Sequence, residues 1–149
     1  MDSWRALLYI KVSSSISSPA FSVAFRIATI RAACSLGIKR ICLASSINAI
    51  GGLGSRAGRF DYFPVDENHP TYSEDDYSLG KWVMEQQADS FARRCPEMTI
   101  ASLRIHALPD DPPELQSTVG DPAEGCARGV WGWTLMSEAA RACVLALTA

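Results

Sequence analysis

Several features that mark metal, membrane or nucleic-acid proteins are missing from this chain of 149 residues. Its cysteines show no C-x-x-C spacing, so a metal site has no support. No apolar run reaches the roughly 20 residues of a membrane span. The basic residues are scattered and are not interleaved with aromatic residues, as they would be on a nucleic-acid surface. The sequence therefore predicts no metal, no membrane and no nucleic-acid partner.

The cysteines are few and odd in number, at five. Cys34, Cys42 and Cys143 lie in apolar runs, where a free thiol packs as a small hydrophobic group. Thiols of this kind fit a reducing compartment best. We therefore expect free thiols and a cytoplasmic protein.

Acidic residues are scarce in the first part of the chain. Residues 1–60 hold eight Lys or Arg and one acid, whereas residues 61–149 hold six and fifteen, so the two parts carry +7 and −9. A positive part would suit the phosphates of an anionic cofactor, but uneven surface charge is the simpler interpretation. With 48% hydrophobic and 20% charged residues, the composition is ordinary for one globular domain.

Residues 1–20 match no structural pattern. A short apolar piece at 6–10 precedes Lys11 and a serine-rich run, with Asp2 as the single acid. This composition faintly resembles a transit peptide or a poor signal sequence, but no small-residue cleavage site clearly follows the apolar piece. A disordered segment is the alternative, and both interpretations stay open.

From residue 21 the pattern is that of an α/β fold. Residues 21–36 form a mostly apolar helix that Gly37 ends in the left-handed conformation. Residues 38–44 follow as a strand buried on both faces, as in a parallel sheet. Ligands of such sheets bind beyond the carboxyl ends of the strands, and Ser45 and Ser46 stand at that end.

A second helix follows a long loop. Ser73 is its predicted capping residue, and Pro96 ends it. Tyr77 and Lys81 are four residues apart, so they lie on one face of this helix. A cation held close to a phenol favours the phenolate, so Tyr77 could give or take a proton near neutral pH. The predicted apolar stripe is Leu79, Trp82, Val83 and Phe91, and the predicted solvent-facing residues are Glu85, Gln86, Gln87, Asp89, Arg93 and Arg94.

Three further segments are expected after this helix. Residues 98–105 are rich in apolar and β-branched side chains, which predicts a second strand. Residues 108–129 hold four prolines and three glycines without an apolar period, which indicates a long irregular connection. Residues 131–134 could form a short strand, and Ser137 is the predicted cap of a final helix that ends at Leu147.

The order of these motifs resembles the extended short-chain dehydrogenase/reductase family, the NAD-dependent epimerase/dehydratases. A strand that ends in Ser45-Ser46, a Tyr77-x-x-x-Lys81 helix and a later strand with Arg104 follow one another as in that family. The supporting segments are 36–40 (LGIKR), 64–67 (PVDE) and 139–142 (AARA). The Tyr-x-x-x-Lys spacing alone arises often by chance, whereas the ordered set, which extends over roughly residues 32–147, is specific.

The resemblance implies a partial Rossmann-like α/β fold, a doubly wound parallel sheet with flanking helices, over residues 21–149. It also implies an NAD(P)-dependent oxidoreductase that acts on a small molecule, namely a sugar, a sugar nucleotide or a similar alcohol. The implied roles are Tyr77 as acid/base and cofactor contact, Lys81 on the nicotinamide ribose and on the phenol, Ser46 as catalytic hydroxyl, Ser45 as second choice and cofactor contact, and Asn48 and Arg104 as substrate contacts.

Some of these assignments have structural alternatives. Residues 47–52 replace the family's Val-Tyr-Gly-like turn, which shifts the register by about one residue and leaves the choice between the two serines open. Asn48 is at least as well explained as a turn residue. Arg104 suits a structural salt bridge equally well, and Lys81 on an isolated helix would pair with Glu85 or lie in solvent.

The loop before the second helix gives no cofactor fingerprint. Its glycines at 52, 54 and 58 lead into an aromatic, proline-containing segment instead of opening a helix, so they do not form a phosphate loop. A flexible substrate-side loop is the better interpretation. His69 stands alone in this loop without partners, and we expect it to be a solvated residue.

The glycine-rich turn that holds the cofactor pyrophosphate in the family is the main missing feature. Gly37 is the only glycine before Leu43. We therefore expect a fragment that lacks the glycine-rich half, and strong binding of NAD or NADP is not expected. The alternatives to an active enzyme are a catalytically silent remnant and an interaction module that pairs through an exposed sheet edge, for example as a homodimer.

Overall fold

A computed structural model describes residues 19–52, 54–108 and 132–148 of the chain. Two parallel strands, β1 (Arg40–Ser46) and β2 (Thr99–Ile105), form a sheet near the middle of the molecule. Both strands are the ones expected, although β1 begins and ends two residues later than predicted. The shift places the two serines inside the strand rather than after it.

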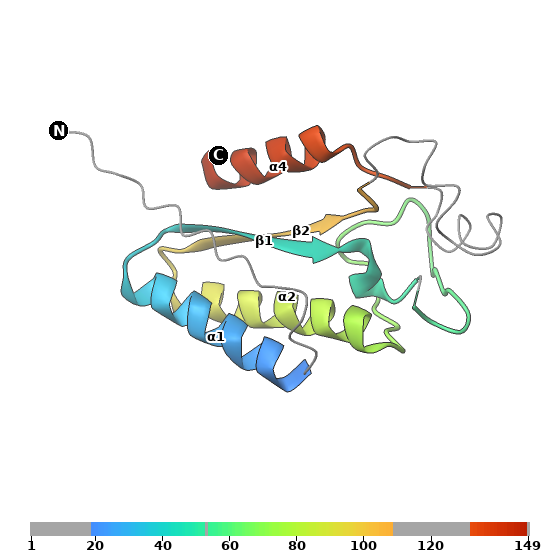
Figure 1. The fold of residues 1–149 in the computed structure, drawn as a ribbon, viewed down its shortest axis with the longest axis horizontal. Coiled ribbons are helices and arrows are strands. Elements are labelled where there is room, and N and C mark those ends of the chain that lie inside the picture. Colours follow the sequence, from blue (N-terminus) through green and yellow to red (C-terminus); the bar gives the residue numbers. More distant parts are fainter. Residues whose placement is uncertain (1–18, 53, 109–131, 149) are drawn as a thin grey trace.

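Helices cover both faces of this sheet. The helices α1 (Pro19–Ser35) and α2 (Asp76–Arg94) lie on one face, and α4 (Met136–Thr148) lies on the other (Figure 1). A short 3-10 helix, η1 (Ile47–Ile50), follows β1 directly. The described chain is therefore a layered α/β structure with a parallel sheet between helices.

The register of the sheet fixes which backbone groups face outward. The strands pair in parallel with Arg40 opposite Thr99. The amide of Thr99 donates to the carbonyl of Lys39 at 2.7 Å, so that carbonyl points toward β2. Carbonyl groups alternate in direction along a strand, so those of Arg40, Cys42 and Ala44 point away from β2.

The core lies between the first two helices and the sheet. Its buried residues are Ile30, Ala33, Phe91, Cys95 and Met98. The partly buried residues packed against them include Ile38, Ile41, Leu43 and Ile100 from the two strands and their approaches. Each large apolar side chain buried in this way contributes roughly 1.5–3 kcal/mol. The packing therefore fixes α2, which carries the candidate site, against both strands.

A disulfide joins Cys34 and Cys95, so the expectation of a free thiol at Cys34 is wrong. Cys34 lies near the end of α1, Cys95 caps the end of α2, and the two are 61 residues apart in the sequence. Packing of the two helices brings them together, which their spacing could not show. Cys42 and Cys143 are free, as predicted. Burial, together with the neighbouring Cys143, raises the pKa of Cys42 to about 11 and keeps this thiol protonated at neutral pH.

Loss of the disulfide is expected to lower the free energy of unfolding by about 2–4 kcal/mol, because the cross-link restricts the unfolded chain. Urea unfolding of the C34S/C95S variant, and of the wild type with reductant, should show the same loss. Reductant added to the C34S/C95S variant is the control and should change nothing further. An unchanged midpoint for the reduced wild type would contradict this role.

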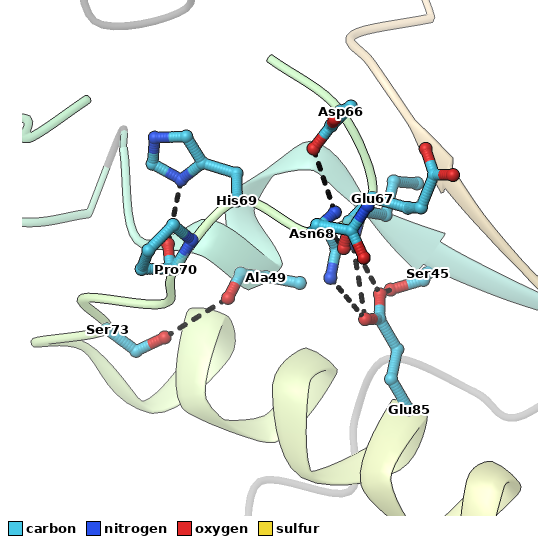
Figure 2. Close-up of polar contacts among 10 residues, drawn as sticks. Ser45, Ala49, Asp66, Glu67, Asn68, His69, Pro70, Ser73 and Glu85 are labelled. Atoms are coloured by element: carbon cyan, nitrogen blue, oxygen red, sulfur yellow. Dashed lines mark hydrogen bonds and ion pairs between the residues drawn. The ribbon is translucent and has the colours of Figure 1, made fainter. Parts of the chain in front are cut away.

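Two predicted helix caps and one predicted strand are wrong. Asp75, not Ser73, caps α2, because the helix begins at Asp76 and the Asp75 side chain accepts the amide of Ser78. Ser73 instead donates from its Oγ to the carbonyl of Ala49 at 3.4 Å (Figure 2). Ser137 lies inside the first turn of α4, and residues 132–134 form no strand.

Three of the sequence predictions fall wholly or partly outside the described residues. These are the N-terminal segment, as far as residue 18, the irregular connection from residue 109 onward, and residue 131 of the predicted short strand. None of the helices in the described ranges combines the length and the apolar composition that crossing a bilayer requires.

Candidate functional site

The two serines that end β1 have different partners. Ser45 is buried, and its hydroxyl donates a hydrogen bond to a carboxylate oxygen of Glu85 on α2. Ser46 caps η1, and its Oγ accepts a hydrogen bond from the amide of Asn48 at 3.2 Å. Within the described residues, no acceptor takes the proton of the Ser46 hydroxyl. Ser46 can therefore donate to a ligand, whereas the Ser45 proton is already engaged.

Gly51 ends η1 in a conformation that suits glycine. Its φ is 89°, and its amide donates to the carbonyl of Asn48 at 2.8 Å. A Cβ at this position would lie 2.4 Å from the carbonyl carbon of Tyr72. The amide of Tyr72 in turn donates to the carbonyl of Ile50 at 3.0 Å. This close approach joins the end of β1 to the loop that leads into α2.

Replacement of Gly51 by alanine should lower the free energy of unfolding by about 2–5 kcal/mol, the sum of left-handed strain and a forced backbone shift. Gly37→Ala is the matched control: Gly37 also has a positive φ, 69°, but nothing lies within 4 Å of its added Cβ. In Gly37→Ala, left-handed strain alone should then lower the free energy of unfolding by about 1–2 kcal/mol. Equal losses in urea unfolding of the two variants would contradict the tight contact at Gly51.

Asp75 fixes the first turn of α2, which carries Tyr77. Its Oδ1 accepts a hydrogen bond from the amide of Ser78 at 2.9 Å. Burial raises the pKa of Asp75, but hydrogen bonds from Ser78 and from backbone amides outweigh this, so the pKa lies below its ordinary value. The carboxylate is therefore stabilised in its charged form at the helix terminus.

Asp75→Asn keeps a capping side chain and removes the charge, so we expect a loss of about 0.3–1 kcal/mol of unfolding free energy at pH 7. Because the pKa of Asp75 in the folded state lies below the ordinary value, the charged cap stabilises the fold fully above about pH 4, and its contribution is lost as the pH falls through the folded pKa. The difference in unfolding free energy between wild type and variant should thus shrink in acid. A difference that stays constant from neutral pH down to about pH 2 would contradict the cap's charge dependence.

Tyr77 and Lys81 lie one helical turn apart beside the end of β1. The ammonium of Lys81 is 5.6 Å from the centroid of the Tyr77 ring, and it donates to the carbonyl of Ala44 at 2.6 Å. This carbonyl faces the outer edge of β1. Tyr77 is 56% exposed, so its phenol is accessible. The helix therefore holds a cation and an accessible phenol together at the tip of the strand.

A pocket of about 320 Å³ lies at the carboxyl ends of both strands. Its walls come from the end of β1, from η1, from the first turn of α2 and from the segment after β2. His106, to which the sequence assigned no role, is one of its lining residues, and its Nδ1 accepts the amide of Ala107 at 3.0 Å. Parallel α/β sheets bind their ligands at this end.

The structure gathers most, but not all, of the predicted site residues. Those that line the pocket are Ser45, Ser46, Asn48 and Tyr77. Lys81 is not a lining residue but lies against the Tyr77 ring. Arg104 forms an ion pair with Glu85, with 2.8 Å between Nη2 and Oε2. A direct contact of Arg104 with substrate therefore stays a prediction, beside the structural role that the ion pair shows.

The prediction that Glu85 faces solvent is wrong, because Glu85 is only 8% exposed. Figure 2 shows its carboxylate reaching from α2 to Ser45. A signal for this was present in the sequence: Glu85 lies four residues after Lys81 and eight after Tyr77, so all three share one helix face. A face that carries the proton-transfer pair must point toward the strand ends.

His69 is also placed differently from the prediction of a solvated residue, since it is 3% exposed. Its Nε2 accepts the amide of Asp61 at 3.0 Å, so the proton is on Nδ1, which donates to the carbonyl of Pro70 at 2.8 Å. The Tyr62 ring lies 5.0 Å away, centroid to centroid. His69 therefore organises the loop between η1 and α2.

Comparisons with known proteins bear on the fold. No family model and no curated protein matches the chain. Among solved structures, it is similar to a short-chain dehydrogenase/reductase superfamily protein from Agrobacterium tumefaciens with bound NAD, at 25% identity and a TM-score of 0.55. That match covers 73% of this chain and 32% of the other.

A second similar structure is the NAD-dependent NDP-hexosamine 5,6-dehydratase TunA, which is involved in tunicamycin biosynthesis. It is 17% identical, with a TM-score of 0.54, and the match covers 76% of this chain and 42% of TunA. The matched part of the chain thus covers less than half the length of either neighbour. The described part of the chain has an α/β fold that matches the Rossmann-like fold of short-chain dehydrogenase/reductase superfamily proteins.

Proposed function

We propose that this chain carries the serine–tyrosine–lysine part of an NAD(P)-linked oxidoreductase site for a sugar-like alcohol, in the extended short-chain dehydrogenase/reductase family. The observation that carries the proposal is that Ser46 and Tyr77 line one pocket while Lys81 lies against the Tyr77 ring. The NAD bound to one structural neighbour, and the hexosamine substrate of the other, support the choice of cofactor and substrate class.

Each of the three side chains has a separate chemical task in this proposal. The Ser46 hydroxyl, whose proton has no acceptor among the described residues, donates to the reacting oxygen. The accessible phenol of Tyr77 takes the proton from the alcohol, or returns it to the carbonyl. The Lys81 ammonium favours the negative charge that forms on the phenol oxygen.

The residues present fit the nicotinamide-ribose end of the cofactor. The pocket offers hydroxyl groups beside an apolar wall, and Lys81 is a charged donor for a ribose hydroxyl. When bound, the nicotinamide would accept or return the hydride at the carbon whose oxygen Ser46 and Tyr77 hold. Gly37 ends α1 instead of opening a helix, so it does not form a pyrophosphate turn. We therefore expect weak binding through the nicotinamide end.

Titration of the purified chain with NADH and with NADPH, followed by nicotinamide fluorescence, tests this proposal. We expect saturable binding that Lys81→Met weakens about 10-fold or more, because a hydrogen bond to a charged group contributes roughly 1.5–3 kcal/mol. Lys39→Met is the matched control, since Lys39 is exposed at the opposite end of β1. No saturable signal, or the same loss in both variants, would contradict the proposal.

The outer edge of β1 favours a second candidate function, strand pairing with another chain. Among the described residues β1 pairs with β2 alone, and the carbonyls of Arg40 and Cys42 point away from it. Such an edge is a template for a further strand. Light scattering should then show a defined dimer or complex. A monomer at every concentration tested would remove this candidate.

A further inference from the structure

Three parts of the fold meet at the carboxylate of Glu85. From β1, the hydroxyl of Ser45 donates to Oε1. From β2, Arg104 donates through Nε to Oε1 at 3.1 Å and through Nη2 to Oε2 at 2.8 Å. The third contact is indirect: Nη1 of Arg104 donates to the carbonyl of Glu67, in the loop between η1 and α2, at 3.3 Å. Glu85 therefore joins α2 to both strands and, through Arg104, to the loop.

Burial makes this cluster selective for one arrangement. The side chains of Arg104 and Glu85 are 20% and 10% exposed. At that depth the ion pair is little screened, and every unmet donor or acceptor is costly. The guanidinium has only donors and the carboxylate only acceptors, so the two groups can pair in only one orientation. Ser45 must then use its proton toward Glu85.

Each residue held by the cluster is next to a part of the candidate site. Ser45 directly precedes Ser46, and Arg104 is two residues before His106. Ser46 and His106 both line the pocket. Glu67 belongs to the loop whose Tyr72 amide bonds to η1. Figure 2 shows Glu67 close to the Ser45–Glu85 contact. Movement of any of these anchors would therefore move a wall of the pocket.

We propose that Glu85 is a positioning residue of the proposed site. By holding Ser45, it keeps the hydroxyl of Ser46 turned toward the pocket, and by holding Arg104 it keeps the loop around Glu67 in place. This inference rests on the proposed function of the same site. It assigns to Glu85 a role through other residues, since Glu85 itself does not line the pocket.

Glu85→Gln is the sharpest test because it keeps the shape and removes the charge. Arg104 offers only donors, so the amide oxygen must face it and the amide nitrogen must face Ser45. The Ser45 hydroxyl would then have to accept instead of donate, and its proton would need a new acceptor. The strand end would be released without a large cavity. Glu138→Gln is the control, since Glu138 is exposed and pairs with Arg141 at 3.5 Å.

Hydrogen exchange by NMR and steady-state kinetics should both be measured on the wild type and on the two variants. In Glu85→Gln we expect exchange at the amides of residues 45–48, 67–69, 71 and 72 to rise about tenfold more than exchange at core amides such as those of Ile41 and Ile100. We also expect kcat to fall about 10- to 100-fold, because a misplacement of about 1 Å can cost that much, while the KM for cofactor stays within about twofold. In Glu138→Gln neither quantity should change.

Two results would overturn the inference. One is exchange at these amides that stays unchanged, or that rises no more than at core amides such as Ile41 and Ile100, whose faster exchange reports only the general loss of stability from the unpaired Arg104 charge. The other is an unchanged kcat in Glu85→Gln when the wild type turns over. A wild type that neither binds cofactor nor turns over would refute the proposed function instead, and the exchange pattern would still decide the role of Glu85.

Discussion

The Tyr77→Phe variant should lose turnover of the alcohol substrate by about 10²- to 10⁴-fold, the usual contribution of a positioned acid/base group. Only the hydroxyl is removed, so the ring that Lys81 approaches to 5.6 Å remains. Because Tyr77 is 56% exposed, the free energy of unfolding should change by less than about 0.5 kcal/mol. Cofactor titration and urea unfolding, done beside the kinetics, separate a chemical loss from a loss of binding or of fold.

Tyr62→Phe is the matched control for this experiment. The phenol of Tyr62 donates to Oδ1 of Asp66 at 2.7 Å in the loop. The hydrogen bond to Asp66 raises the pKa of Tyr62 to about 12, so this phenol stays protonated near neutral pH. Turnover should therefore be unchanged in Tyr62→Phe. A Tyr77→Phe variant that keeps wild-type turnover, or a Tyr62→Phe variant that loses as much, would contradict the assigned role.

Replacement of Glu85 by alanine should lower the free energy of unfolding by about 3–5 kcal/mol. The change leaves the guanidinium of Arg104, whose side chain is 20% exposed, without its carboxylate. It also removes the acceptor of the buried Ser45 hydroxyl. The double variant E85L/R104M should recover most of the loss, because it leaves no charge without a partner. Urea unfolding of both variants measures these differences.

The matched control for this loss is Glu138→Ala in the exposed ion pair of α4. The side chains of Arg141 and Glu138 are 70% and 58% exposed, so solvent screens their attraction. Removal of one partner should then cost at most about 1 kcal/mol. If Glu85→Ala proved no more destabilising than Glu138→Ala, the buried cluster would not be the structural anchor that the contacts indicate.

The buried face of α2 differs from the one predicted, because the prediction used only the positions of the apolar residues. Leu79, predicted to face inward, is 46% exposed. The buried residues of α2 are Ser78, Met84, Glu85, Ala88 and Phe91. Each of them lies three, four or seven residues from another member of the set, so together they mark one face. The first half of this face is partly polar because it meets the strand ends. Only its second half meets the apolar core.

Elements with strong local signals could be predicted from the sequence. Gly37 adopts the left-handed conformation, at φ 69°, just after α1, as its position predicted. The segment rich in β-branched residues became β2, one residue shorter than predicted. Local backbone preference decides such features, so no tertiary contact was needed to infer them.

Features that depend on contacts between distant residues could not be predicted. The disulfide joins two cysteines that are 61 residues apart in the sequence. The hydrogen bond from Ser45 to Glu85, which gives Ser45 a different role from Ser46, joins residues that are 40 apart. The burial of His69 depends on the amide of Asp61 and on the turn of the loop. The candidate pair Tyr77 and Lys81 could be named because one helical turn relates them, but their place beside Ala44 could not.

The central claim is that one nicotinamide site lies at the tip of β1, lined by Ser46 and Tyr77, with Lys81 beside the Tyr77 ring. Its most direct test is a titration of the ¹⁵N-labelled chain with NADH, followed by amide shifts in NMR spectra. We predict saturable shifts at residues 44–48, 77–81 and 105–108, with little change in α4 or at the amino ends of the strands. Shifts that gather on another surface, or that do not saturate, would contradict the claim.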